Sequence, residues 1–303
     1  MQEQPPRAGE VQKLEEGLAC VLAANASPMT HWGTNSYILG GDRVAVIDPG
    51  PASDAHLAAL LQAIGGRTVS HILVTHSHVD HSPLARPLAR ATGAPVLAFG
   101  DSLAGRSEVM QVLAAQGDLT GSEGVDPDFT PDICLADGDT IAGDGWTLRA
   151  LHTPGHLGNH MCFQWGDVVF TGDHVMGWAT SVVSPPDGDL TDYMASCHRL
   201  AATQAARAYA GHGAPIPNLQ HRLAQIIAHR QAREAEILAA LHHGPATPQQ
   251  LTTAIYHDVP KALLPMAQRN VLAHLVDLTS RGVTRPEGPA GTPIDPDAAF
   301  SII

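Results

Sequence analysis

Seven consecutive residues, Thr75-His76-Ser77-His78-Val79-Asp80-His81, bring three imidazoles and one carboxylate together. These side chains hold Zn²⁺ in proteins and can leave a coordination position open for water. Alternate side chains of an extended segment point to the same side, so His76 and His78 should face one ion. Asp80 and His81 come after a bend and can face a second ion. We therefore predict that one loop serves two metal ions.

Three later segments offer further ligands, each directly after an expected strand. His152-Thr153-Pro154-Gly155-His156 contains a Pro-Gly turn that can direct His156 inward. Phe170-Thr171-Gly172-Asp173-His174 ends an apolar run with a carboxylate, and Gly211-His212-Gly213 places a histidine where backbone segments can approach closely. Each segment alone is typical of an ordinary turn. The four segments together, in this order, predict a metal centre.

The elements around the first motif should place it at the end of a strand. The apolar run 70–74 predicts a buried strand, and Ser82-Pro83 predicts the N-cap and first position of a helix over 84–91. A strand-to-helix turn of this kind is where α/β sheets commonly carry their chemistry. Other strands are expected at 18–24, 35–39, 43–47 and 206–210, with three more within 140–171, and helices at 53–64, 189–203 and 218–242.

In these motifs the chain resembles the metallo-β-lactamase-fold hydrolases. The resemblance extends upstream, where 33–39 and 46–50 look like the first hairpin of that family. It implies an α/β fold, a four-layer αββα sandwich. It also implies the ligand sets: His76, His78 and His156 for one zinc ion, Asp80, His81 and His212 for the other, and Asp173 bridging both.

Two downstream segments, 188–193 and 229–234, are similar to one branch of the family. That branch is the β-lactamase-like proteins with a C-terminal winged-helix extension, whose characterised eukaryotic members are endoribonucleases. We accordingly expect a catalytic domain over 1–243 and a winged-helix-like domain over 244–303. Thr247-Pro248-Gln249-Gln250 predicts a capping box, 266–278 is a second amphipathic helix, and 281–283 resembles the entry to a wing.

Charge argues against a nucleic-acid-binding role for the extension. From Gly244 onward the chain has four Lys/Arg and five Asp/Glu, so the basic stripe that binds DNA or RNA is missing. A lid or a homodimer contact is favoured instead, and no DNA partner is expected. The formal net charge of −13 disfavours long polyanions in general, although an RNA substrate stays open.

Composition predicts a soluble, cytoplasmic protein. Apolar residues make up 44% of the chain, and the four cysteines are scattered without C-x-x-C spacing, as in a reducing compartment. The first residues lack the apolar core of a secretion signal, and no segment is long enough to cross a membrane. A secreted enzyme that degrades β-lactams is therefore not favoured.

The expected chemistry follows from the two metal ions. They lower the pKa of a shared water to about 7, which makes a metal-bridging hydroxide available to attack a carbonyl or phosphoryl group. Asp80 would bind zinc and orient this nucleophile. His174 would protonate the leaving group, or it has a purely structural role. His31, Trp32 and Trp178 are candidates for an apolar substrate-binding wall, with core packing as the alternative.

Three functions are consistent with these residues. The leading one is a dinuclear zinc hydrolase of a small ester, thioester or related carbonyl compound. The alternative is a phosphodiesterase or endoribonuclease acting on single-stranded RNA. The third is a non-hydrolytic, iron-dependent member, because histidines and carboxylates also suit iron or manganese.

Overall fold

The computed structural model describes residues 5–117, 124–257, 260–289, 292 and 294–303. Its first sheet has seven strands in sequence order, antiparallel from β1 to β4 and parallel from β4 to β7. The strands are β1 (Val11–Glu15), β2 (Leu18–Leu22), β3 (Asn35–Gly40), β4 (Arg43–Ile47), β5 (Thr68–Leu73), β6 (Val96–Ala98) and β7 (Ile133–Cys134).

The second sheet has five strands in the order β12-β11-β10-β9-β8. Only the β11–β12 pair is parallel among these described strands. They are β8 (Thr140–Ala142), β9 (Thr147–His152), β10 (Met161–Trp165), β11 (Val168–Gly172) and β12 (Arg207–Ala210). The region 140–171 therefore holds four strands, one more than expected. The additional strand is β8, which is only three residues long and is flanked by Asp and Gly residues, so no apolar run indicates it in the sequence.

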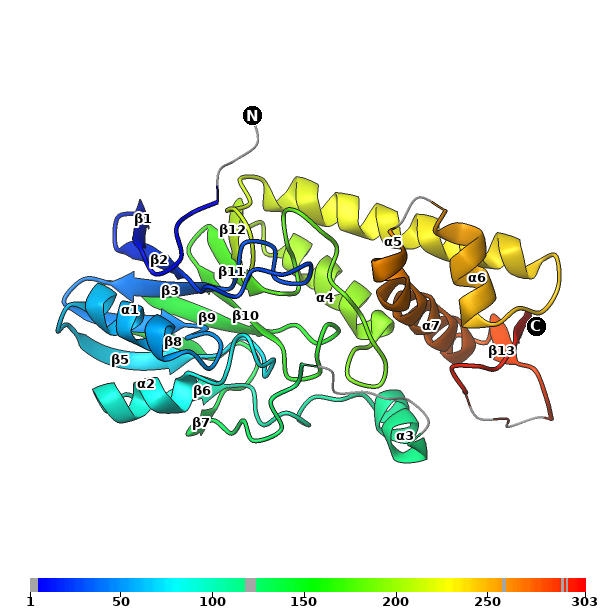
Figure 1. Ribbon diagram of the computed structural model, residues 1–303, viewed down its shortest axis with the longest axis horizontal. Helices are drawn as coiled ribbons and strands as arrows, with labels where there is room; N and C mark the ends of the chain where they lie inside the picture. Colours follow the sequence, from blue (N-terminus) through cyan, green and yellow to red (C-terminus); the bar gives the residue numbers. More distant parts are fainter. Residues whose placement is uncertain (1–4, 118–123, 258–259, 290–291, 293) are drawn as a thin grey trace.

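The two sheets pack face to face, with helices on both outer faces (Figure 1). Apolar residues of both sheets, among them Leu39 and Phe163, form the central core. Helices α1 (Asp54–Ile64) and α2 (Ala85–Thr92) cover the first sheet, and α4 (Leu190–Ala202) and α5 (Leu219–Leu241) cover the second. These four layers confirm the predicted αββα sandwich. A further helix, α3 (Glu108–Gln116), packs against the C-terminal region.

One capping prediction is wrong. Helix α2 begins at Ala85 after Leu84, which makes no side-chain cap, so Ser82 is not the N-cap. Ser82 instead donates its hydroxyl to the backbone oxygen of His78 at 3.1 Å and to Asp126 Oδ2 at 2.9 Å. The serine therefore fixes the end of the histidine-rich loop and leaves the helix uncapped.

The C-terminal region forms the expected winged helix. It comprises α6 (Pro248–Ile255), a short 3₁₀ turn (Lys261–Leu263), α7 (Leu264–Ser280) and the antiparallel pair β13 (Thr284–Pro286) and β14 (Phe300–Ile302). The capping box of Thr247 and Gln250 is present at the start of α6.

The C-terminal region shares its core with the sandwich. Ile237 and Leu241 of α5 pack against Val271 and Phe300, while Ala273 of α7 packs into the core beneath α4 and α5. In Figure 1 the long helix α5 accordingly runs from the sandwich across α6 and α7. The boundary at 243/244 stays a prediction. None of the described helices is long and apolar enough to span a lipid bilayer.

Candidate metal centre

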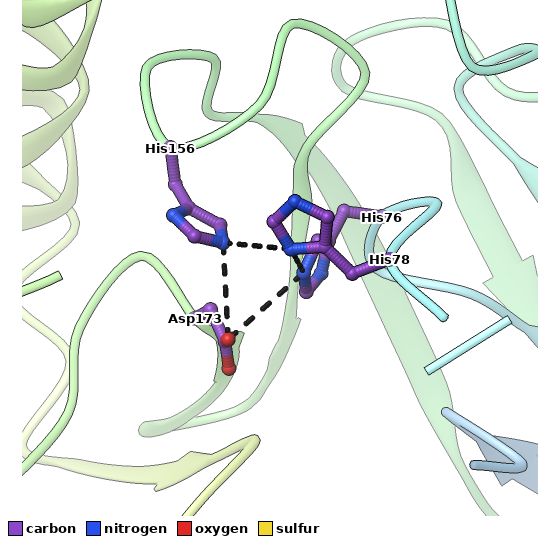
Figure 2. A group of neighbouring side chains, drawn as sticks. All are labelled: His76, His78, His156 and Asp173. Carbon is purple, nitrogen blue, oxygen red and sulfur yellow. Dashed lines mark hydrogen bonds and ion pairs between the residues drawn. The ribbon is translucent and has the colours of Figure 1, made fainter. Parts of the chain in front are cut away.

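Four predicted ligands converge from three separate loops (Figure 2). His76 and His78 follow β5, His156 follows β9, and Asp173 follows β11. Each offers one ligand atom, and these atoms lie within 4.8 Å of one another. His78 Nδ1 is 2.9 Å from His76 Nε2 and 3.1 Å from His156 Nε2, and Asp173 Oδ2 lies 3.8 Å from His156 Nε2.

A second group lies beside the first. Asp80, His81 and His212 also bring their ligand atoms within 4.8 Å of one another. His212 Nε2 lies 3.1 Å from Asp80 Oδ2 and 3.3 Å from Asp173 Oδ2, and His81 Nε2 is 3.4 Å from Asp173 Oδ1. Asp173 therefore contacts members of both groups, as a carboxylate between two ions would.

Backbone carbonyls hold two of the histidines in a single tautomer. His156 Nδ1 donates to the oxygen of Val182 at 2.7 Å, and His212 Nδ1 donates to the oxygen of Gly33 at 3.0 Å. A carbonyl oxygen can only accept, so the proton is on Nδ1 in both rings. Nε2 then faces the other ligands, and in the neutral ring its lone pair is available for a metal ion, which is the usual arrangement of a metal-binding histidine.

Asp48 supports the site, and the sequence reading did not select it. It lies directly after β4, is 1% exposed, and accepts a hydrogen bond from His81 Nδ1 at 3.0 Å. The same carboxylate accepts from the backbone N–H and the hydroxyl of Thr75 at 2.7 and 2.8 Å. Its signal was a carboxylate directly after an apolar strand, followed by Pro49-Gly50.

Buried polar atoms show that the residues fit a metal. His81 Nε2 and Asp173 Oδ1 are both buried and have no hydrogen-bond partner among the described residues, although they lie 3.4 Å apart. Buried polar atoms are normally satisfied, and a cation between these two would satisfy both. A donor set of imidazole nitrogens and carboxylate oxygens suits zinc, iron or manganese.

The electrostatics differ between the two groups. Burial and the neighbouring His156 lower the pKa of His78 to about 3, so this imidazole is neutral and ready to coordinate. Burial alone would lower the pKa of His212, but Asp173 and Asp80 outweigh it and raise that pKa to about 9. Burial would raise the pKa of Asp173, but His212 and His81 hold it well below its usual value. In the second group a metal ion would therefore displace protons from histidine.

The ligands border a cavity of about 360 Å³. His78, Asp80, His156, Asp173 and His212 all line it. Helix α7 of the C-terminal region contributes Met266 and Arg269 to its wall. Sequence reasoning missed both, since nothing local to 264–280 indicates that this helix faces the metal ligands.

His174 points away from this cavity. Its side chain is fully buried, with Nε2 at 3.5 Å from Cys197 Sγ and the ring packed on Tyr193. Burial lowers its pKa to about 3, so the ring is neutral and carries no imidazolium proton at neutral pH. This placement favours the structural role over the proton-donor role.

The three proposed wall residues lie together, but beside a neighbouring cavity. His31 stacks between Trp32 and Trp178, with ring centroids 4.7 and 4.6 Å apart. All three line a separate cavity of about 430 Å³, and none of them lines the metal cavity. A Cβ on Gly213 would lie 2.7 Å from the Trp178 ring, so this stack supports the backbone next to His212.

The model of the metallo-beta-lactamase superfamily matches residues 29–212, more than half of the chain. The chain belongs to the metallo-β-lactamase superfamily. The model of the beta-lactamase associated winged helix domain matches residues 247–291. Together with the cluster of metal-binding side chains, this membership makes the protein a metal-dependent hydrolase.

Three similar proteins illustrate the relationship. A beta-lactamase-like protein 2 homolog of Caenorhabditis elegans is 30% identical over 280 residues, covering 90% of this chain and 88% of its own. An atrochrysone carboxyl ACP thioesterase of Aspergillus fumigatus is 33% identical over 275 residues, covering 84% and 78%. The crystal structure of a metallo-beta-lactamase family protein from Thermus thermophilus superimposes with a TM-score of 0.75 at 27% identity, covering 96% of this chain and all of that one.

Proposed function

We propose that this superfamily member is a dinuclear zinc hydrolase of small ester, thioester or related carbonyl substrates. The observation that carries the proposal is the contact of Asp173 with both ligand groups beside one cavity. The thioesterase named among the relatives supports an acyl substrate. When bound, two zinc ions would supply Lewis acidity toward a substrate carbonyl and would lower the pKa of water enough for it to act as a nucleophile at neutral pH.

The chain's own residues would orient the reactants. Asp80 Oδ2 accepts a hydrogen bond from Thr34 Oγ1 at 3.1 Å, and its carboxylate also borders the cavity. It is therefore held in a fixed position from which it can orient the attacking water. His156 and His212, each fixed through Nδ1, keep Nε2 directed at the cavity.

The cavity wall indicates where the acyl part of the substrate fits. Met29, Val79 and Met266 are apolar residues of this wall. Arg269 is the one Lys or Arg among the described residues that line the metal cavity; it lies in the wall with Asp187 and donates to Ser184 Oγ at 3.2 Å. We infer that the acyl part of the substrate lies near Met266 and Met29.

Charge weighs against the RNA alternative. An RNA groove needs several cations along the backbone path, whereas the described cavity wall provides Arg269 alone. The small-molecule substrate, the cytoplasmic location and the choice of zinc over iron or manganese are parts of the proposal. A homodimer also stays a prediction.

Hydrolysis assays on zinc-loaded protein test this proposal. The panel contains acyl thioesters, aryl esters, lactones, β-lactams, bis(p-nitrophenyl) phosphate and short single-stranded RNA. We expect turnover of thioesters or esters that is lost with chelator and restored by zinc. Turnover restricted to the phosphodiester or RNA would contradict the acyl assignment, and about zero metal per folded chain after zinc loading would contradict the centre itself.

A further inference from the structure

The segment Ser181–Ser184 connects the metal ligands to the C-terminal region. The carbonyl of Val182 accepts the hydrogen bond from His156 Nδ1 at 2.7 Å. One residue earlier, the hydroxyl of Ser181 donates to the backbone oxygen of Asp173 and, at 2.9 Å, to that of His174. The position of this segment therefore affects two metal ligands at once, one through its side chain and one through its backbone.

Two side chains from helices α5 and α7 hold this segment. Asn270 Oδ1, on α7, accepts from the backbone N–H of Val183 at 3.3 Å and from Arg230 Nη1 at 2.9 Å. Arg230 Nη2, on α5, donates to the backbone oxygen of Ser181 at 2.5 Å. Asn270 Nδ2 is itself fixed by the backbone oxygen of Met266, at 3.1 Å.

Burial makes these contacts specific. Arg230 is 3% exposed and its guanidinium lies 5.2 Å from the ring centroid of Tyr193. Nη1 and Nη2 of Arg230 are satisfied by Asn270 and Ser181, whereas Nε has no partner among the described residues. Leaving a further donor of a buried guanidinium unsatisfied is costly, so Arg230 favours this position of the Ser181 carbonyl. The segment belongs to no described strand or helix and has no sheet ladder to fix it. Its two neighbouring helices supply the fixing groups instead.

We propose that Asn270 and Arg230 are positioning residues of the metal centre, which hold the segment 181–184 so that the Val182 carbonyl fixes the ring of His156. The inference rests on the proposed metal centre. In this role the winged helix needs no basic surface, because α7 helps to hold the metal ligand His156 in position. The four Lys/Arg and five Asp/Glu from Gly244 onward agree with such a role.

The test compares three substitutions in the full-length chain. Asn270→Leu has a similar volume but loses the oxygen that accepts from Val183 and Arg230. Asn270→Asp keeps that oxygen and should rescue the contact. Thr279→Val is the matched control. Thr279 is on the same helix as Asn270 but far from the segment, and the substitution removes its hydrogen bond to Thr284 (3.1 Å) on β13.

The readouts are zinc affinity by chelator competition, the visible spectrum of the cobalt-substituted protein and the melting temperature. We expect Asn270→Leu to lower the affinity for one of the two zinc ions about 10- to 100-fold, which is the usual effect of losing a group that hydrogen-bonds to a metal ligand. The substitution should also alter the absorption bands of the cobalt-substituted protein. Asn270→Asp and Thr279→Val should bind both ions as the unmodified protein does.

The outcomes separate this inference from the proposed function. If Asn270→Leu is folded and binds both ions with unchanged affinity and spectrum, the positioning role is wrong while the metal centre stands. If the unmodified protein takes up no metal, the proposed function and this inference both fail. Should Asn270→Leu not fold, Arg230→Lys is measured in its place. Lysine is shorter and lacks the planar fork whose two nitrogens contact Asn270 and the Ser181 carbonyl separately. The same loss of affinity is therefore expected, and unchanged affinity overturns the role.

Discussion

The backbone of Gly211 passes directly against the carboxylate of Asp173. A Cβ at position 211 would lie 2.5 Å from Asp173 Oδ1 and 2.7 Å from His81 Cε1. Any side chain there would displace the carboxylate that contacts both ligand groups. The glycine before His212 is therefore part of the metal site, although it offers no ligand.

Gly211→Ala should lower metal occupancy more than it lowers stability. Asp173 or His81 must shift to accept the new methyl group, and ligand geometry tolerates little displacement. We expect loss of one ion per chain and at least a tenfold fall in kcat, measured by elemental analysis and steady-state assays. Gly177→Ala is the control, since its nearest contact would be an ordinary 3.5 Å. Full occupancy in Gly211→Ala would show that the site adapts to the methyl group.

Asp80→Ala should abolish turnover by more than it lowers the melting temperature. The carboxylate accepts from Thr34 Oγ1 and contacts His212, so its loss removes both a ligand and the group that orients the nucleophile. A cost of a few kcal/mol in barrier corresponds to roughly 100-fold or more in kcat. The decisive measurement is kcat per metal-loaded molecule. A value near that of the unmodified protein, with both ions bound, would remove Asp80 from the mechanism.

The local parts of the site could be predicted from sequence, while the parts made by distant segments could not. His76, His78, Asp80 and His81 stand within six residues, so their types and spacing indicate a metal loop directly. Asp48 is visible only as a carboxylate after a strand, and its bond to His81 depends on the parallel pairing of β4 with β5.

The contribution of α7 shows the same limit more clearly. The amphipathic spacing of its apolar residues predicts a helix, but it does not say which neighbours the polar face meets. Arg269 and Asn270 reach the cavity and the segment 181–184 only because Ala273 packs beneath α4 and α5. Similarly, Ser82-Pro83 carries a good N-cap signal, yet the tertiary contact of Ser82 with Asp126 prevails.

His274 should make the protein less stable in acid. It is 1% exposed on α7, and neither ring nitrogen has a hydrogen-bond partner among the described residues. Burial, and then the charges of Arg230 and Arg233 with smaller contributions from His229 and Arg281, lower its pKa to about 3. The folded protein therefore holds this ring neutral, whereas the unfolded chain protonates it at a pKa of about 6.5.

The sign of the effect follows from linkage. Above pH 6.5 both states keep His274 neutral, so it has no influence on stability. As the pH falls from 6.5 toward 3, the unfolded state takes up a proton that the folded state refuses, and stability falls by up to about 1.4 kcal/mol per pH unit. His274→Leu removes this linkage. Between pH 7 and pH 5 its free energy of unfolding should therefore fall by about 2 kcal/mol less than that of the unmodified protein.

Urea denaturation at both pH values, with chelator present throughout, measures this difference without a contribution from metal release. His243→Gln is the matched control, because His243 is exposed and should leave the pH dependence unchanged. At pH 7, His274→Leu should be at least as stable as the unmodified protein, since no hydrogen bond to the ring is lost. An unchanged difference between pH 7 and pH 5 in His274→Leu would mean that the ring becomes protonated in the folded state, by a local opening of α7 against α5.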